Sequence, residues 1–329
     1  MNIINNLIKE AKKDLKTIVL PETTDSRTLK AASLVDFAKI ILIGDNNKIK
    51  ELANKEKLNL DNIEIINPET YEDLDTLINE FYNLRKHKGL TLEEAKNIIK
   101  TNYLYFGCML VKLDKADGLV AGAITTSSDV LRAALQTVKT APDTKLVSSF
   151  FIMELENKNY GENGLFIYSD CGLNINPTED ELVEIAYSSA KSFKTLINKE
   201  PKIAMLSHST YGSSKAKNAI KVKNATKKFQ EKYPNIILDG ELQVDAALIK
   251  TVQIQKAKES KLKAEANVLI FPDIDSGNIA YKLTERLANA KAYGPITQGI
   301  NKPINDLSRG CNYEDIIGAI AITCIQAKK

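Results

Sequence analysis

The segment 301–315 concentrates side chains that could handle an anion and an acyl group. It reads Asn-Lys-Pro-Ile-Asn-Asp-Leu-Ser-Arg-Gly-Cys-Asn-Tyr-Glu-Asp and precedes an apolar segment of helical character. Arg309 can bind a phosphate through two parallel hydrogen bonds, and the hydroxyl of Ser308 can donate to an oxyanion. Asp315 offers a carboxylate that could act as a base, but Asn312 and Asp315 also have the spacing of a helix capping box. The sequence leaves both interpretations of Asp315 open.

A second candidate site follows the apolar segment Gly118–Ala121. Four consecutive hydroxyl residues, Thr125–Ser128, come after a glycine-containing turn and just before a segment of helical period that carries Arg132. Because the N-terminus of a helix presents free backbone N–H groups and a positive dipole, such a junction attracts phosphate. The alternative is an ordinary cap beside a surface arginine. The candidate phosphate ligands here are Thr126, Ser127 and Ser128.

Two further junctions carry polar residues without a complete chemical set. His208 lies in a hydroxyl-rich loop and has no acidic partner nearby in the sequence, which favours a structural role over that of a base. Asp273 and Asp275 follow Phe271 and could bind a metal, but nothing in that segment completes a ligand set. We expect a capping turn there and no metal site.

The elements that must position these residues read as an α/β fold. Short apolar segments, bounded by Gly, Pro, Asp or Asn, alternate with longer segments of helical period, as in mainly parallel sheets covered by helices on both faces. Thr178 and Glu181 have capping-box spacing at the start of one such helix. The predicted strands are Thr17–Leu20, Ile40–Ile43, Ile63–Ile66, Gly118–Ala121, Leu165–Tyr168, Ile203–Leu206, Ile236–Leu238 and Val268–Phe271.

Two segments have the composition of crossings between domains, Ala141–Thr144 and Tyr293–Pro295. Two crossings predict a first α/β domain made of residues 1–145 plus 298–329, interrupted by a second α/β domain, residues 146–297.

Composition narrows the classes of protein further. The 329 residues carry a formal net charge of +3, which is too balanced for a nucleic-acid-binding surface. The four cysteines include no CxxC pair, and we expect free thiols in a reducing compartment. The N-terminus does not resemble a signal peptide, and no apolar stretch is long enough to span a bilayer. We therefore expect a cytoplasmic protein that does not bind membranes.

The sequence also contains two lysine-rich stretches, Lys221–Lys232 and Lys250–Lys263. We interpret them as solvated helix faces.

Five motifs, in this order and spacing, resemble the phosphate acetyltransferase family in its short form. The resemblance spans the chain from Val19 to its end, and it implies two doubly wound domains similar to those of isocitrate and isopropylmalate dehydrogenases. It also implies an active site in the interdomain cleft and a homodimer. The motifs are DGLVAGAITTSSDVLRAALQ, SDCGLNINPTEDELVEIAYSSA, LDGELQVDAAL, FPDIDSGNIAYKL and GPITQGINKPINDLSRGCNYEDI.

The resemblance implies the reaction acetyl-CoA + phosphate ⇌ CoA + acetyl phosphate, with coenzyme A as a substrate and no tightly bound cofactor. Motif matching places Ser308, Arg309 and Asp315 on the family's catalytic loop. It places Arg132 and Arg85 on arginines associated with coenzyme A. The chain departs from the family pattern at His208 and Tyr211, where Phe and Lys are expected, so a ligand role for that loop is in doubt.

Several alternatives remain at this point. We expect direct attack by the thiol of coenzyme A in a ternary complex, because an acetyl-enzyme on Cys311 or Ser308 would need a nearby base. Phosphoryl transfer of the acetate kinase type would need Mg²⁺ and a nucleotide-binding loop, and neither is visible. Phosphate butyryltransferase, a dehydrogenase of similar fold and a binding module without catalysis are the rival functions.

Overall fold

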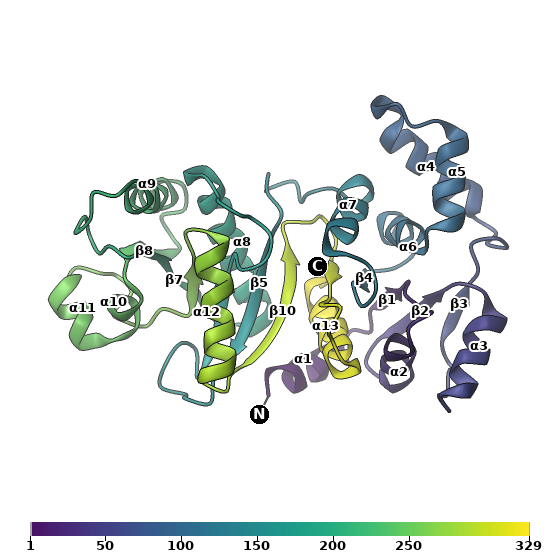
Figure 1. Ribbon diagram of the computed structural model, residues 1–329, viewed down its shortest axis with the longest axis horizontal. Helices are drawn as coiled ribbons and strands as arrows, with labels where there is room; N and C mark the ends of the chain where they lie inside the picture. The colour runs from purple at the N-terminus through teal and green to yellow at the C-terminus, as the bar shows by residue number, and fades with distance from the viewer. Residues whose placement is uncertain (1, 329) are drawn as a thin grey trace. The chain divides into compact units, whose positions relative to one another are not determined.

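The computed structural model describes residues 2–328, which fold into two compact α/β units (Figure 1). The first unit comprises Met1–Pro142 and Ile300–Lys329, and the second comprises Asp143–Gly299. Each unit has one sheet of its own, with five strands in the first and six in the second.

The sheet of the first unit is entirely parallel, in the strand order β11-β4-β1-β2-β3. Parallel strands that run in one direction place all their carboxyl ends at the same edge, where loops lead into the next helices. The strands are β1 (Thr17–Leu20), β2 (Lys39–Ile43), β3 (Glu64–Ile66), β4 (Gly118–Ala121) and β11 (Ile304–Asp306).

Helices cover both faces of this sheet. In β4, Leu119 lies against Gly107 of α6, whereas its neighbour Gly118 lies against Thr323 of α13. Because successive residues of a strand point to opposite faces, these two contacts place α6 and α13 on opposite sides. The helices of the unit are α1 (Ile3–Ala11), α2 (Ser26–Leu34), α3 (Asn46–Lys55), α4 (Leu74–Arg85), the 3₁₀-helix η1 (Lys86–Lys88), α5 (Leu92–Thr101), α6 (Tyr103–Lys112), α7 (Ser127–Thr137) and α13 (Tyr313–Gln326).

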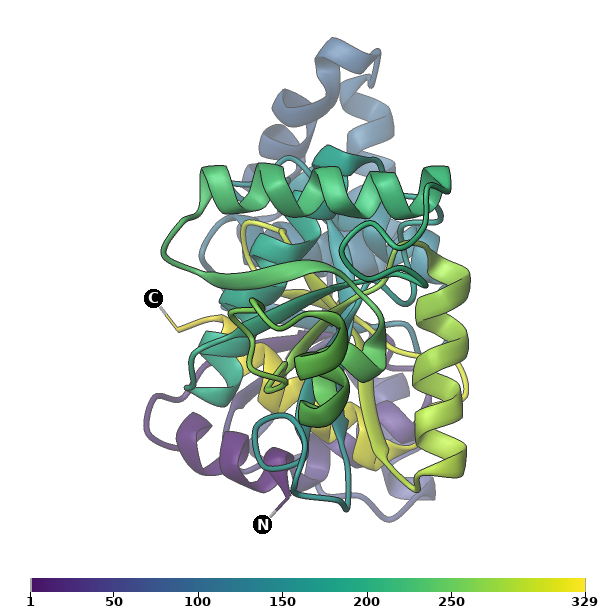
Figure 2. The ribbon, with the colours of Figure 1, turned by 90° about the vertical axis from the view of Figure 1, so that its left-hand side faces the viewer.

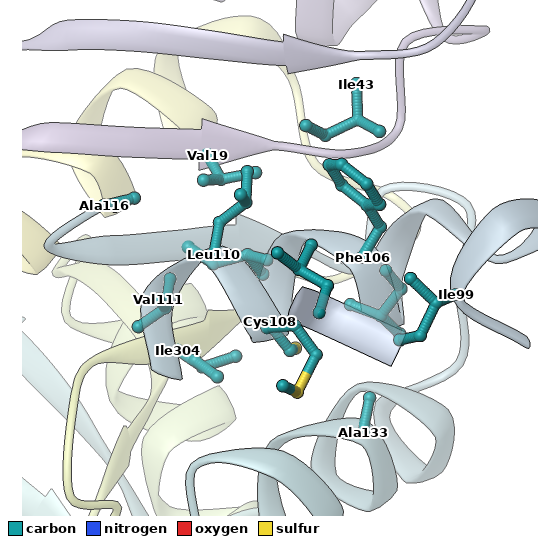
Figure 3. Close-up of a cluster of buried hydrophobic side chains, with 14 of the residues drawn as sticks. Val19, Ile43, Ile99, Phe106, Cys108, Leu110, Val111, Ala116, Ala133 and Ile304 are labelled. Carbon is teal, nitrogen blue, oxygen red and sulfur yellow. The ribbon is translucent and has the colours of Figure 1, made fainter. Parts of the chain in front are cut away.

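The core on the α6 side joins strands and helices that are far apart in the sequence. Val19 of β1, Phe106 of α6, Ala133 of α7 and Ile304 of β11 belong to the same buried cluster (Figure 3). The burial of each valine, phenylalanine or isoleucine side chain in this cluster stabilises the fold by about 1.5–3 kcal/mol relative to an exposed one. This packing fixes the ends of β4 and β11 beside the start of α7.

The sheet of the second unit is mixed, in the order β10-β5-β6-β9-β7-β8. The β6, β9, β7 and β8 strands pair in parallel, whereas β5 is antiparallel to both β6 and β10. The strands are β5 (Ser148–Glu154), β6 (Leu165–Ser169), β7 (Lys202–Leu206), β8 (Ile237–Leu242), β9 (Val268–Ile270) and β10 (Lys291–Gln298). The helices are α8 (Glu179–Ile197), α9 (Lys217–Lys232), α10 (Val244–Leu248), α11 (Lys250–Lys256) and α12 (Ile274–Leu287). Figure 2 shows these elements in a view turned by 90° from that of Figure 1.

The prediction of an α/β fold with mainly parallel sheets is confirmed, and all eight predicted strands are present within a few residues. Three strands were not predicted, β5, β10 and β11. The Gly294-Pro295 pair, interpreted above as a domain crossing, lies inside β10, where the pairing with β5 shifts register between Tyr293 and Ile296. Proline is tolerated there because β10 is an edge strand.

Several local predictions hold in the second unit. Thr178 and Glu181 form the capping box of α8. The lysine-rich face of α9 pairs with acidic residues of α8, since Lys228 contacts Asp180 at 2.8 Å and Lys232 contacts Glu184 at 2.9 Å. The first lysine-rich stretch is therefore a solvated helix face, as expected. The second is helical only over Lys250–Lys256 and continues in turns to Lys263, so the prediction of a helix face holds for its first part alone.

Candidate active site

The loop that carries Ser308 and Arg309 and the hydroxyl-rich turn after β4 lie side by side in the first unit. The strands that lead into them, β11 and β4, pair in parallel, with Asp306 opposite Ala121. The backbone N–H of Leu307 continues this ladder and donates to the carbonyl of Ala121 at 2.8 Å. Two segments that are 180 residues apart in the sequence thus leave the sheet at the same point.

Arg27 of α2 holds the two segments together. Its Nη1 donates to the carbonyl of Arg309 at 2.9 Å and to that of Cys311 at 2.7 Å. Its Nη2 donates to the carbonyl of Ala123 at 2.9 Å, and Asp25 pairs with the same guanidinium at 2.7 Å. The Arg27 side chain keeps the pKa of Asp25 below its usual value. Because guanidinium donors are fixed in a plane, this single side chain sets the spacing of both segments.

The turn after β4 wraps around the carboxylate of Glu22, a residue that is only 5% exposed. Its oxygens accept hydrogen bonds from the backbone N–H groups of Gly122 and Ala123, at 2.9 and 2.7 Å. They also accept from those of Ile124 and Thr125, at 3.2 and 2.8 Å. These four N–H groups are therefore not free for a phosphate, and the prediction of a phosphate site at this junction depends on Thr126, Ser127 and Ser128.

The donors that remain available at this junction lie at the start of α7. Thr126 is the N-cap, and its hydroxyl accepts from the N–H of Asp129 at 3.3 Å and lies 3.0 Å from the Ser128 hydroxyl. The helix geometry leaves the N–H groups of Ser127 and Ser128 without an intrahelical acceptor. The capping interpretation thus holds for Thr126, and the anion-binding capacity rests on the two serines that follow it.

Asp306 lies between the two segments. The residue is 6% exposed, and its buried Oδ1 has no hydrogen-bond partner within the part of the chain that the structure describes. Burial raises the pKa of Asp306 to about 6, and the Glu22 carboxylate adds to this effect, while the Ser127 hydroxyl opposes it.

The groups of the C-terminal loop differ in how they are held. The Ser308 hydroxyl accepts from the N–H of Gly310 at 3.3 Å. Arg309 is exposed, and its guanidinium forms no hydrogen bond or ion pair within residues 2–328. Asp315 accepts the backbone N–H of Asn312 through Oδ2 at 2.9 Å and completes the capping box of α13. The capping interpretation of Asp315 is therefore confirmed, and its exposed Oδ1 is still available to another group.

Arg132 lines a pocket of about 350 Å³ in the same unit, beside Thr125. Arg132 also pairs with Asp129 at 2.7 Å across one turn of α7. The phenol of Tyr105 lies on the pocket wall and donates to Gln136 at 2.9 Å. Burial raises the pKa of Tyr105, and the charges of Arg132 and Arg85 counteract that effect. Arg132 and Arg85, the two arginines predicted to bind coenzyme A, therefore both act electrostatically on Tyr105.

The other sequence candidates take structural roles. Asp273 caps α12 by accepting from the N–H of Ser276 at 2.9 Å, as the capping interpretation predicted. His208 pairs with the Ser214 hydroxyl at 3.1 Å, and Tyr211 donates to Asp239 at 2.6 Å. Among the described residues, no three His, Cys, Asp or Glu side chains gather as a metal site would require. None of the helices in the described part of the chain has both the length and the apolar character needed to span a membrane.

Glu22 and Arg27 were not identified from the sequence, and Asp306 was recognised only as one of the polar groups in the segment 301–315, without a role. Glu22 and Arg27 lie in Pro-Glu-Thr-Thr-Asp-Ser-Arg, directly after the predicted strand Thr17–Leu20. Their position after a predicted strand could have pointed to these two residues, because the other candidate residues also lie where a strand leads into a helix. Their partners are about 100 and 280 residues away, so only the folded sheet reveals what they bind.

Comparisons with known proteins identify the family of this chain. Residues 2–324 match the family described as phosphate acetyl/butaryl transferase. The phosphate acetyltransferase of Acetivibrio thermocellus is 53% identical over 331 residues, covering 100% of this chain and 99% of the relative. A phosphotransacetylase structure from Streptococcus pyogenes superimposes with a TM-score of 0.93 at 41% identity, covering 99% of this chain and 98% of that one.

A more distant likeness concerns the fold alone. The structure of 4-hydroxythreonine-4-phosphate dehydrogenase from Klebsiella pneumoniae has a TM-score of 0.54 at 10% identity, over 95% of this chain and 98% of that one. It supports the expected resemblance to a dehydrogenase fold, whereas the much higher identities and full coverage of the transferases decide the family. This chain belongs to the phosphate acetyl/butaryl transferases.

Proposed function

We propose that this protein catalyses the reversible reaction acetyl-CoA + phosphate ⇌ CoA + acetyl phosphate. The observation that carries this proposal is the match of the whole chain to relatives named phosphate acetyltransferase. The contacts of the Arg27 guanidinium with the carbonyls of Arg309 and Ala123 support it, because they link the loop of Ser308 and Arg309 to the turn that leads into α7. These two segments carry hydroxyl, N–H and guanidinium donors suited to a phosphate.

In this proposal Arg309 binds the phosphate portion of acetyl phosphate. Its exposed, unpaired guanidinium can form two parallel hydrogen bonds with phosphate oxygens. Ser127 and Ser128 contribute further donors from the start of α7, and Thr126 caps that helix. The Ser308 hydroxyl then donates to the oxyanion that develops when the carbonyl is attacked.

The thiol of coenzyme A attacks the carbonyl carbon directly. A C–S bond forms, the C–O bond to phosphate breaks, and the thiol proton passes to Asp315 as the attack develops. The Oδ1 oxygen of Asp315 can receive it while Oδ2 continues to cap α13. The leaving phosphate needs no proton, because Arg309 neutralises its charge.

An acetyl-enzyme on Cys311 is the less favoured route. Cys311 is 7% exposed, and burial raises the pKa of its thiol, with Arg27 opposing the shift. A buried thiol with a raised pKa is a poor nucleophile because little thiolate is present at neutral pH. Ser308 interacts with a backbone N–H rather than with a base, so it lacks activation as well.

Coenzyme A carries phosphates of its own, and we assign these to Arg132 and Arg85. Arg132 lines the 350 Å³ pocket together with Tyr103, Tyr105 and Ile124, which combine apolar and polar surface. An adenine-containing ligand with several negative charges fits such a surface better than a neutral one.

An assay with purified protein tests the reaction. Acetyl, propionyl and butyryl phosphate are each mixed with coenzyme A, and thiol loss and acyl thioester formation are followed. We expect acetyl phosphate to give the highest kcat/KM and a chelator to leave the rate unchanged. Preference for butyryl phosphate would reassign the acyl specificity, and no turnover with any of the three would refute the proposal.

We also propose that the protein works as a homodimer in the cytoplasm. The four cysteines are all free, which suits a reducing compartment. Helix α12 exposes Ile279, Leu283 and Leu287, at 57%, 51% and 82% of their surface, in a row with a spacing of four residues. Residues four apart share one helix face, and an exposed apolar row of this kind marks a surface that a second copy can cover.

A further inference from the structure

Asp306 occupies the point where the two candidate phosphate-binding segments leave the sheet. It is the last residue of β11, two positions before Ser308, and it pairs with Ala121, which precedes the turn that leads to Ser127. None of the roles described above uses its carboxyl.

The Asp306 carboxyl lies directly against the backbone of the turn, because Gly122 has no side chain to keep it away. A Cβ atom at Gly122 would lie 2.3 Å from Asp306 Oδ1 and 2.5 Å from the N–H nitrogen of Leu307, so only glycine fits. The Oδ1 atom is buried, and within the described chain it has no partner. Leaving such an oxygen unpaired costs less free energy on a neutral carboxyl than on a carboxylate.

The surroundings of Asp306 raise its pKa above the usual value for an aspartate. Burial has the largest effect and raises the pKa to about 6, the Ser127 hydroxyl and the Leu307 N–H act against it, and the negative charge of Glu22 adds a smaller increase. Asp129 on α7 is already paired with Arg132, and Asp315 on α13 caps its own helix. A phosphate bound at Ser127 would add further negative charge beside the carboxyl and raise its pKa further.

The proton on Asp306 decides what the Ser127 hydroxyl can do. A serine hydroxyl has a single hydrogen to donate. If Asp306 is ionised, Ser127 donates to the carboxylate and presents only lone pairs to a phosphate. If Asp306 is protonated, it donates to Ser127, whose own hydrogen is then free for the phosphate.

We propose that Asp306 is a positioning residue that binds phosphate-bearing substrates with its carboxyl protonated, donating to Ser127 so that Ser127 donates to the phosphate. The proposal rests on the proposed function, because it concerns the phosphate site of that reaction. It predicts that phosphate binding takes up one proton at Asp306.

The test compares the wild type with Asp306→Asn, whose amide donates to Ser127 at every pH. Because the folded-state pKa of Asp306 is raised to about 6, the wild type should lose phosphate affinity as the pH rises through that value. We expect the ratio of KM for phosphate, wild type over Asp306→Asn, to rise about tenfold or more between about pH 6 and about pH 8. Both proteins meet the same ionisation of phosphate, so the ratio isolates the protein group.

A direct binding measurement gives a second readout. Calorimetric titration of inorganic phosphate in two buffers of different ionisation enthalpy counts the protons exchanged on binding. At about pH 7.5 the wild type should take up about one proton more than either Asp306→Asn or Ser127→Ala. The matched control is Asn305→Ala, because Asn305 is buried on the same strand but donates to Thr323 and Gln326 of α13. It should leave the pH dependence of phosphate binding unchanged.

The outcomes separate this inference from the proposed function. A constant KM ratio across the pH range, or equal proton uptake by wild type and Asp306→Asn, would overturn the role of Asp306. Loss of activity in Asp306→Asn at every pH, with its fold intact, would overturn it too, since the charge itself would then be required. A wild type that shows no phosphate-dependent turnover would refute the proposed function instead.

Discussion

At the scale of single residues, two guanidinium groups of the candidate site have different roles. The exposed guanidinium of Arg309 has no partner within the described chain, whereas that of Arg27 makes six hydrogen bonds to main-chain and carboxylate oxygens. The first is therefore available to a substrate, and the second is committed to the shape of the site. The sequence pointed to Arg309 as a candidate ligand, but it gave no sign that Arg27 binds main-chain carbonyls from two distant segments.

Replacing Arg309 by Lys should lower kcat/KM by about 100-fold, because a bidentate contact with phosphate becomes a single point charge. Steady-state kinetics in the direction of acetyl-CoA synthesis measure this. The melting temperature should stay at the wild-type value, since no contact of the folded chain is lost. Turnover close to that of the wild type would remove Arg309 from the phosphate site.

Replacing Arg132 by Ala should raise the KM for coenzyme A about tenfold and leave the KM for acetyl phosphate unchanged. Its ion pair with Asp129 is exposed and contributes little to stability. The matched control is Lys96→Ala, which removes an exposed cation from the neighbouring helix α5 outside the pocket lining. Equal effects of the two variants on coenzyme A would mean that the pocket does not bind it.

At the scale of secondary-structure elements, the site depends on how two helices begin. The start of α13 is closed by the reciprocal capping box of Asn312 and Asp315, and that of α7 by Thr126. Capping fixes the direction of the chain just before each helix, which is where the candidate ligands lie. A cap and a catalytic group can therefore share one residue.

Two variants of the α13 cap separate those roles of Asp315. Asp315→Asn keeps an oxygen that can accept the N–H of Asn312 but cannot take the thiol proton, so kcat should fall at least about 100-fold with a small loss of stability. Asn312→Ala removes the N-cap and should cost about 1 kcal/mol of unfolding free energy with kcat preserved. The experiment pairs turnover with urea denaturation. If Asp315→Asn lost stability only, its function would be capping alone.

Glu22 fixes the turn between β4 and α7 through four backbone N–H groups. In Glu22→Gln, one of the two acceptor oxygens becomes an NH₂ group that faces N–H donors. The free energy of unfolding should therefore fall by about 2–3 kcal/mol. Denaturant unfolding measures this loss against the control Glu64→Gln, an exposed glutamate on the edge strand β3. Similar stabilities for the two variants would contradict the assignment of Glu22.

At the scale of the whole molecule, an exposed apolar surface on the second unit bears on how copies of the protein could assemble. In the second unit α12 exposes three large apolar side chains in one row, although the helix as a whole is amphipathic. A row of this kind is costly to leave in water and is typical of a contact between protein molecules.

Leu283→Asp should convert the proposed dimer into monomers, because a carboxylate in the centre of an apolar contact remains unpaired on both subunits. Sedimentation velocity at micromolar concentration measures the change in mass. The control is Lys282→Asp, which places the same charge on the adjacent residue of α12, outside the Ile279–Leu283–Leu287 row. A wild type that sediments as a monomer, or a Leu283→Asp variant that stays dimeric, would exclude this surface.

Local sequence patterns determined the fold class and most of the elements of this protein. Buried parallel strands such as Gly118–Ala121 are continuous apolar segments bounded by turn residues, and capping boxes such as Thr178–Glu181 are readable within four residues. The short strand β11 and the interrupted β10 escaped prediction, because three residues, or a Gly-Pro pair within a strand, carry too little periodicity.

Only the tertiary structure decided how the site is held together. Whether the N–H groups after β4 are free depends on Glu22, which is 100 residues away, and the link between the two loops depends on Arg27. The raised pKa of Asp306 depends on its burial beside a turn that needs glycine at position 122. Charges and donors act over a few ångströms in space, whatever their separation along the chain, so the sequence specifies the chemical groups and the sheet specifies their partners.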